Sequence, residues 1–435
     1  MRTPVIARRT FLGQAAALAG MTALTACQLI QRQPAGEPAQ AATEITFMNW
    51  DTVKDTPLEI AIQEFERQNP PYKVKVQPTP ARYEDKMRTL LAAGTPPDVM
   101  RINDDYVRGY SVKNQLLDLT PYLKADNIRR EDYFEFVFDF AKQPDGKYTA
   151  WSIGNQPRLI YYNVNAFKDA GVPLPPTEWT SKDWTWDDFL ARAKKLTVEG
   201  QRWGALIYDD TGFEQTFAVN NGEEDGIYSK DGKKFTLANP KGAEAIQWAA
   251  DLTCKHKVQP EWSLLRQEGA NNMFVAGKIA MFFRTQGIIP YLRRNIKNFE
   301  WDVAPVPAKV KQMTEGSLIV FCIPKAAKNP DGGWRLLRFL GGPGGGKIFA
   351  ETSYFIPAMK EPARLIKAGK EPPAHVELFV KAMEYQTTVN YTENTERARQ
   401  IYRPELELVY TCKARADDIL TKVRPLVEDA LVGKY

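Results

Sequence analysis

Residues 44–102 alternate strand-like and helix-like segments in a regular order. Apolar positions such as Leu58, Ile62 and Phe65 recur at the three- and four-residue spacing of a helix. Short runs rich in β-branched and aromatic residues lie before and after such helices, at 44–50, 72–77 and 98–102. Parallel strands need a helical crossover between them, so this order predicts βαβ units with a parallel sheet. The predicted fold class is therefore α/β.

A second region of the same character begins after Tyr148. A helix is expected to start at Thr185, where Asp188 completes a capping-box pattern, and Asp231-Gly232 predicts a hairpin turn within residues 227–237. Helical patterns dominate after Trp334. The strands expected in this region are 159–163, 204–208, 280–283, 301–306 and 317–323. A chain that leaves one domain and later returns to it crosses over several times, which predicts two α/β lobes around a hinged cleft.

The first residues of the chain predict export. Arg8-Arg9 opens an apolar stretch that ends at Ala26, shorter than the roughly 20 residues of a membrane-spanning helix. A charged start, an apolar middle and a small-residue end are typical of a signal peptide, here 1–26. Arg8-Arg9-Thr-Phe-Leu resembles a twin-arginine signal, and Leu-Thr-Ala-Cys27 resembles a bacterial lipobox, in which Cys27 carries the lipid. The alternative is a plain secretory signal with a chance cysteine.

Residues 27–43, rich in Gln, Pro and Ala, predict a flexible tether that holds a folded body off the membrane. We therefore expect an extracytoplasmic protein that is lipid-anchored to the bacterial cell membrane and exported by the twin-arginine route.

Charge and composition exclude several functions. The net charge of +5 is mild for 435 residues, and no basic cluster interleaves with aromatic residues, so nucleic acid is not an expected partner. Two histidines, His256 and His375, argue against His-built zinc sites and Ser-His-Asp triads; no metal and no cofactor are expected. Once Cys27 is assigned to lipid, the remaining cysteines, Cys254, Cys322 and Cys412, allow at most one disulfide. Burial as small hydrophobic residues is the default interpretation for Cys254 and Cys322.

An ordered series of segments resembles family 1 extracellular solute-binding proteins of ABC importers, of the maltose-binding-protein type. The most specific are Ala93-Gly-Thr-Pro-Pro-Asp-Val99 and Phe274-Val-Ala-Gly-Lys-Ile-Ala-Met281. The others are 116–120, 159–163, 184–196, 316–317 and 355–358. The resemblance implies a two-lobed periplasmic-binding-protein fold with three interdomain crossovers. Its expected lobes are 44–152 with 284–327, and 153–283 with 328–435.

The resemblance also implies a function. Such proteins are not enzymes; most bind a sugar or oligosaccharide in the cleft and deliver it to the permease subunits of an ABC importer. We expect a monomer that closes over its ligand about crossovers near 152–158, 284 and 325–328.

The candidate ligand-binding residues follow from position, because ligands of open α/β sheets bind at strand carboxyl ends. The first lobe offers Trp50, Asp51, Arg82, Tyr83, Asn103, Asp104 and Asp105, and the second Tyr208, Asp210 and Phe213. The crossovers and later loops offer Trp151, Gln156, Arg158, Arg284, Gln286, Gly316, Ser317 and Tyr354.

These residue types suit a carbohydrate. Trp and Tyr stack on its apolar face, while Asp, Asn, Arg and Gln satisfy its hydroxyl groups. Two alternatives stay open. The same fold could bind a glycerophosphodiester, a polyamine or an oxyanion. The chain could instead be a secreted glycosidase that uses two carboxylates drawn from Asp104, Asp105, Asp209 and Asp210.

Overall fold

Three parallel strands form one end of the sheet in the computed structural model, which describes residues 42–209 and 212–434. They are β1 (Thr43–Asn49), β2 (Tyr72–Pro78) and β3 (Val99–Ile102), and β1 lies between the other two. Helices α1 (Pro57–Gln68) and α2 (Tyr83–Ala92) connect them in sequence. The βαβ units predicted from the sequence are confirmed.

Helix α1 shows why this segment folds as it does. The Thr56 hydroxyl caps its first turn by accepting a hydrogen bond from the Glu59 main-chain N–H, and Pro57 supplies a φ angle that suits a helix start. Leu58, Ala61, Ile62 and Phe65 are buried on one face. That apolar face anchors the helix in the core.

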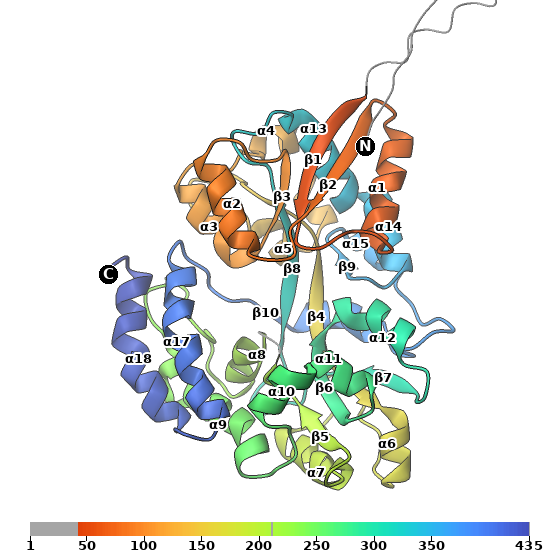
Figure 1. Ribbon diagram of the computed structural model, residues 1–435, viewed down its shortest axis with the longest axis vertical. Helices are drawn as coiled ribbons and strands as arrows, with labels where there is room; N and C mark the ends of the chain where they lie inside the picture. Colours follow the sequence, from red (N-terminus) through yellow and green to blue (C-terminus); the bar gives the residue numbers. More distant parts are fainter. Residues whose placement is uncertain (1–41, 210–211, 435) are drawn as a thin grey trace, which may run out of the picture. The chain divides into compact units, whose positions relative to one another are not determined.

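Two long strands connect the elements around β1, β2 and β3, which we call the first group, to the elements around β5 (Trp203–Leu206) and β6 (Ile279–Thr285), the second group. Strand β4 (Trp151–Asn163) pairs antiparallel with β8 (Thr314–Cys322) over residues 151–157, and β8 also pairs with β3. Beyond Arg158, β4 pairs instead with β6 and with β7 (Trp301–Ala304). The main sheet order is β2-β1-β3-β8-β4-β6-β5, with β5 parallel to β6 (Figure 1).

The second group of helices lies around β5 and β6. The capping box predicted at Thr185 is confirmed: its hydroxyl accepts from the Asp188 N–H, and the Asp188 carboxylate accepts from the Thr185 N–H. The helices of this group are α6 (Val164–Asp169), α7 (Trp186–Leu196), α8 (Phe213–Asn220), η2 (Thr236–Ala238), α9 (Pro240–Cys254), α10 (Trp262–Glu268), α11 (Ala270–Val275), η3 (Gln286–Ile288) and α12 (Ile289–Asn295).

The C-terminal helices α17 (Thr395–Tyr410) and α18 (Ala416–Leu431) pack against each other and against α9. They therefore belong with the second group. The remaining short elements are α3 (Asp104–Val112), α4 (Thr120–Ala125), η1 (Arg130–Asp132), α5 (Glu135–Asp139), β9 (Ile356–Pro357), α15 (Lys360–Ala363), α16 (Leu378–Lys381), η4 (Ala382–Tyr385) and β10 (Gln386–Thr387).

Two segments pack differently from their expected lobes. Helices α13 (Pro330–Gly341) and α14 (Pro343–Glu351) were expected in the second lobe, yet α14 packs on α1 and α13 on β1 and β4. Strand β7 was expected in the first lobe, yet it pairs with the far half of β4, on the edge opposite β6. Sequence order alone cannot show where a chain re-crosses a shared sheet.

The hairpin expected at residues 227–237 is also absent, although its turn forms. Gly232 adopts a φ of 68°, and Lys234 and Ser229 are joined by a main-chain hydrogen bond. The flanking residues make no strand pairing; Leu237 lies in η2 and Tyr228 is buried. The turn residues are a local signal, whereas strand formation depends on a neighbouring edge to pair with.

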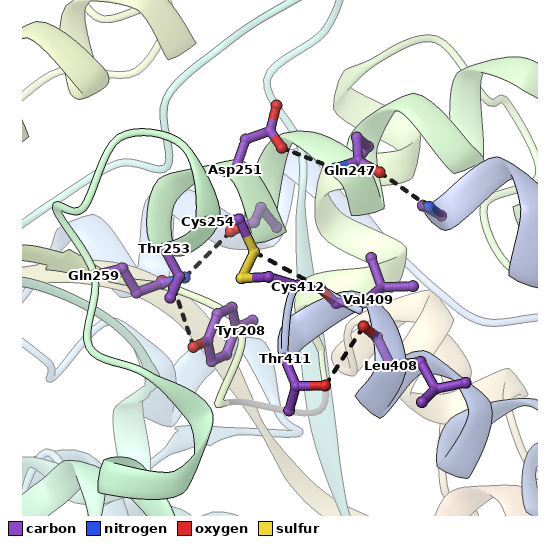
Figure 2. The surroundings of a disulfide bond; sticks show 12 residues. Tyr208, Gln247, Asp251, Thr253, Cys254, Gln259, Leu408, Val409, Thr411 and Cys412 are labelled. Atoms are coloured by element: carbon purple, nitrogen blue, oxygen red, sulfur yellow. Dashed lines mark hydrogen bonds between the residues drawn. A yellow bond between two sulfur atoms is a disulfide. The ribbon is translucent and has the colours of Figure 1, made fainter. Parts of the chain in front are cut away.

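One disulfide joins Cys254, at the end of α9, to Cys412, just after α17 (Figure 2). The default interpretation of Cys254 as an unpaired buried residue is therefore wrong, because the C-terminal helices bring a cysteine 158 residues away beside it. Cys322 is a buried free thiol in β8, as expected. The single permitted disulfide is thus Cys254–Cys412.

Candidate ligand-binding cleft

Two adjoining cavities lie where elements from both groups meet. The first, of about 340 Å³, is bounded by the start of α3, by β4 and β8, by residues near α8, and by the segment leading into α17. The second, of about 300 Å³, lies on the α3 and α5 side and shares Asp104, Glu315, Val389 and Tyr391 with the first. The two cavities together form a candidate ligand-binding cleft.

The structure brings six of the predicted residues to these cavities. Asn103, Asp104 and Asp105 follow the carboxyl end of β3, where the sheet presents its loops. Arg158 and Ser317 come from the crossover strands β4 and β8 and complete the lining of the first cavity, while Gly316 lines the second. A β-carbon at Gly316 would meet the side-chain amides of Asn155 and Gln386, so any larger residue there would displace these side chains.

Three arginines and three carboxylates form ion pairs around the first cavity. Arg158 pairs with Glu315 between β4 and β8, and Arg399 of α17 pairs with Asp105 of α3. Arg403, one turn further along α17, lies 3.1 Å from Glu214 of α8. The carboxylates of Asp105, Glu214 and Glu315 are all buried, so each depends on its arginine for compensation.

Asp104 differs from these carboxylates. Its Oδ1 accepts the Asp105 main-chain N–H at 3.0 Å, and no arginine or lysine of the described residues forms an ion pair with it. Burial raises the pKa of Asp104 to about 8, and the neighbouring carboxylates of Asp105 and Glu315 add to the shift. The cleft therefore contains one carboxyl group that resists ionisation.

Three tyrosines supply the aromatic surface of the first cavity: Tyr228, Tyr391 and Tyr402. Burial raises the pKa of each phenol, so all three are neutral at physiological pH. Tyr402 donates a hydrogen bond to Glu214 at 3.2 Å. Tyr228 is 1% exposed, and its hydroxyl lies close to that of Tyr402. Aromatic faces and polar groups together suit a ligand with both apolar and polar surfaces.

Several predicted residues lie in the core instead. The Trp151 ring packs against Tyr133, Phe138 and Trp334 and is 3% exposed. Tyr208 donates to the Pro260 carbonyl and stacks on Tyr410. Phe213 also packs against Tyr410, and Gln286 is fully buried beside Ser353. These side chains line neither cavity, because the C-terminal helices and α13 cover them.

A second set of predicted residues gathers near the ends of β1 and β3. Trp50 lies under Arg101, whose guanidinium carbon is 4.1 Å from the indole centroid, and its edge meets Tyr83. The Tyr83 hydroxyl donates to the Arg101 carbonyl at 2.7 Å. Asp51 and Arg82 are exposed, and Arg82 is paired with Asp85. Neither cavity includes these residues, nor Tyr354 or Gln156.

Arg284 lies at a separate surface depression. It forms an ion pair with Asp209 at 2.7 Å, and both line a cavity of about 520 Å³ with Arg266 and Asn271. Asp210 and Cys27 lie outside the described residues. The placement of ligand contacts at Arg284 and Asp210 thus stays a prediction.

Sequence reasoning missed much of the lining, above all the contribution of the C-terminal part of the chain. The resemblance on which it relied ended near Met359, whereas Tyr391, Arg399 and Arg403 lie beyond it. Arg399 and Arg403 are four residues apart on one helix face, a spacing visible in the sequence. The remaining missed residues of the first cavity are Gly212, Gln215, Ile227, Tyr228, Glu315, Val389, Thr395 and Tyr402.

Within residues 42–209 and 212–434, no three His, Cys, Asp or Glu side chains are arranged to hold a metal ion. The same part of the chain contains no helix that is long and apolar enough to cross a membrane.

A two-lobed α/β fold with a polar cleft at the crossover strands defines a solute-binding protein. The model of the bacterial extracellular solute-binding protein family matches residues 50–347, and the chain belongs to that family. This confirms the family predicted from the ordered motifs.

The relatives match between about a third and two thirds of the chain at low identity. A putative binding protein of Brucella abortus is 25% identical over 290 residues, which cover 64% of this chain and 67% of that one. The diacetylchitobiose-binding protein DasA of Streptomyces coelicolor is 28% identical over 173 residues, or 38% of this chain and 36% of that one. Among solved structures, the ABC substrate-binding protein Lmo0181 of Listeria monocytogenes in complex with cycloalternan matches with a TM-score of 0.82 and 23% identity, over 91% of this chain and 100% of that one.

Proposed function

We propose that this chain is the extracytoplasmic substrate-binding protein of an ABC importer, which binds a sugar or oligosaccharide between its two lobes and delivers it to a membrane permease. The observation that carries the proposal is the first cavity, whose wall is built from α3, from the crossover strands β4 and β8, and from α17. The named ligands of two similar proteins, diacetylchitobiose and cycloalternan, are both carbohydrates.

The chemistry of the lining supports a polyol over an oxyanion. Each arginine of the cavity already has a carboxylate partner, so an incoming anion would compete with a buried ion pair. Asn103 and Ser317 supply neutral hydrogen-bonding groups of the kind that recognise hydroxyls. The proposal includes no catalytic step; of the adjacent acids Asp104 and Asp105, the second is paired with Arg399.

Export and lipid anchoring at Cys27 form part of the proposal. The Cys254–Cys412 disulfide supports an oxidising compartment outside the cytoplasm. Cys27→Ala, expressed in the native cell, is expected to release the protein from the membrane fraction. A variant that stays bound to the membrane would contradict the lipid anchor.

The function is tested by a thermal-shift and calorimetric screen of residues 28–435 against sugars, polyols, glycerophosphodiesters, polyamines and oxyanions. A ligand that binds only the folded state, at 100 times its dissociation constant, stabilises by about 2.7 kcal/mol. We expect a response to a carbohydrate, recovered chemically unchanged. A response to an oxyanion alone would overturn the sugar assignment, and a hydrolysed sugar would favour a glycosidase.

A further inference from the structure

The ionisable acids of the first cavity outnumber its basic groups. The three buried ion pairs Arg158–Glu315, Arg399–Asp105 and Arg403–Glu214 each contain one positive and one negative group. Asp104 lines the same cavity and remains outside these pairs. Counted over the described lining residues and Glu214, the cavity therefore has one more acidic group than basic groups.

Asp104 occupies a position where a ligand could reach it. Its side chain lines both the first and the second cavity, at the point where they adjoin. One carboxyl oxygen accepts the Asp105 main-chain N–H, which fixes the group at the start of α3. A carboxylate has more acceptor sites than this one bond uses, so acceptor capacity remains for a ligand.

The walls around Asp104 favour a cation as well. Tyr391 lines both cavities together with Asp104, and Tyr228 lines the first. Aromatic faces attract cations, most strongly where water is excluded. A carboxyl group and tyrosine rings around one cavity are suited to an ammonium group.

We propose that the cleft takes a carbohydrate that carries a protonated amine, and that Asp104 is the specificity-determining residue that pairs with this nitrogen. The inference rests on the proposed function and names the substrate class within it. A neutral sugar would leave Asp104 in its protonated form, whereas an amino sugar stabilises the carboxylate and donates hydrogen bonds to its remaining acceptor sites.

If Asp104 pairs with an ammonium group, ligand binding is expected to change the number of protons that the protein carries. The charged and titratable groups near Asp104 include Asp105 on α3, Glu315 on β8, Tyr391 before α17 and Arg399 on α17, and Arg108 of α3 lines the second cavity with it. Burial, together with the carboxylates of Asp105 and Glu315, raises the pKa of Asp104 to about 8. The empty site thus retains a proton on Asp104 at neutral pH. An ammonium group favours the carboxylate, so binding is expected to release that proton.

The test compares matched sugars that differ in one substituent: glucosamine with glucose, galactosamine with galactose, mannosamine with mannose, and the free-amine disaccharide of chitosan with cellobiose. Titration calorimetry is run at slightly acidic to neutral pH, in buffers of different ionisation enthalpy, which reports the protons released. We expect the amine to bind at least about tenfold more tightly than its neutral partner in the pair that binds best, a difference of about 1.4 kcal/mol, with proton release.

Asp104→Asn is expected to abolish both the preference and the proton release, because it keeps an oxygen for the helix start and removes the charge. Asp118→Asn is the matched control: Asp118 accepts the Thr120 main-chain N–H at 2.9 Å and lines neither cavity of the cleft. Tighter or equal binding of the neutral sugar, or a preference that survives Asp104→Asn, overturns the inference and leaves the proposed function standing. If no carbohydrate of either kind binds, the proposed function and the inference both fail.

Discussion

Asp104 makes the unliganded protein less stable as the pH rises. In the unfolded chain its carboxyl ionises near its ordinary value of 3.8, whereas burial and the adjacent carboxylates hold the folded pKa near 8. Between these values the unfolded state has lost a proton that the folded state keeps, so stability falls with pH; below the ordinary value both states are protonated and the penalty vanishes. A group that costs stability in the empty site is typical of binding sites rather than of cores.

Asp104→Asn is therefore expected to stabilise the protein increasingly as the pH is raised. The advantage over the native chain should grow by at least about 1.4 kcal/mol, a tenfold change in the folding equilibrium, across the pH range between the two pKa values. Urea unfolding at a series of pH values measures it. An advantage that is constant across the range would show that the carboxyl ionises normally in the fold.

The contact between β5 and α7 depends on one glycine. A β-carbon at Gly204 would lie 1.9 Å from the Ala193 carbonyl oxygen and 2.5 Å from its carbonyl carbon. The obstacle is main chain, which cannot rotate away as a side chain can. The strand can thus approach the helix this closely only without a side chain.

Gly204→Ala is expected to destabilise the fold by about 1–3 kcal/mol, because strand and helix must separate to admit the methyl group. Gly369→Ala is the control, since no atom lies within 4 Å of the added carbon there. Chemical denaturation of both variants measures the difference. Equal stability of the two would mean that the strand–helix contact adjusts without cost.

The Cys254–Cys412 disulfide joins α9 to the end of α17, the helix that supplies Arg399 and Arg403 to the cleft. A bridge that closes a loop of 158 residues lowers the entropy of the unfolded chain, which in the chain-entropy model is worth about 5 kcal/mol and in measured cases often less. Reductant is therefore expected to lower the melting temperature of the native protein.

The double variant Cys254→Ser/Cys412→Ser should melt near the temperature of the reduced native protein and no longer respond to reductant. Its remaining thiol, Cys322, is buried in β8 and serves as the internal control. Equal melting of native protein with and without reductant would show that the bridge contributes no stability.

The secondary structure was predictable because it follows local sequence patterns. Strand pairing and helix packing were less predictable because they depend on residues far apart in the sequence. The Thr185 capping box and the apolar face of α1 depend on residues within a turn or two, and both are as expected. The hairpin at 227–237 failed because its turn is local, whereas its strands needed a partner edge. The packing of α13 and α14 on the first group of elements was equally beyond local reasoning.

The candidate site was predictable where it follows strand ends. Asn103, Asp104 and Asp105 come directly after β3, and the edge of a parallel sheet places such residues at a cleft. Trp151 and Tyr208 also lie near strand ends, yet α13 and the C-terminal helices cover them. Whether a strand-end residue faces the cleft or the core depends on helices that lie hundreds of residues away in sequence.

The two groups of elements are joined by continuous strands and by ion pairs. Strands β4 and β8 run side by side from one group to the other, as Figure 1 shows. Helix α17 packs with the second group, yet its Arg399 pairs with Asp105 of α3 and its Glu396 lies 3.1 Å from Arg88 of α2. The continuous strands allow bending, whereas the ion pairs of α17 hold the two groups of elements together across the cleft.

Arg399→Ala is expected to shift the unliganded protein toward more open conformations. The substitution leaves the buried carboxylate of Asp105, which is 3% exposed, without its arginine partner. Separation of the two groups of structural elements would expose this carboxylate to water. Truncating one partner of a buried charge pair costs about 2–5 kcal/mol. Because the ligand needs both walls of the cleft, its apparent affinity should fall in proportion to the closed population.

Small-angle scattering measures this change as a larger radius of gyration without ligand, and saturating ligand should restore the native value. Arg415→Ala is the matched control, because Arg415 pairs with Asp417 at 3.0 Å on the exposed surface of α18 and touches no other element through that pair. The double variant Arg399→Ala/Asp105→Asn should return toward the native radius, since it removes the stranded charge. Equal radii for Arg399→Ala, Arg415→Ala and the native protein would mean that the ion pairs of α17 do not control the opening of the cleft.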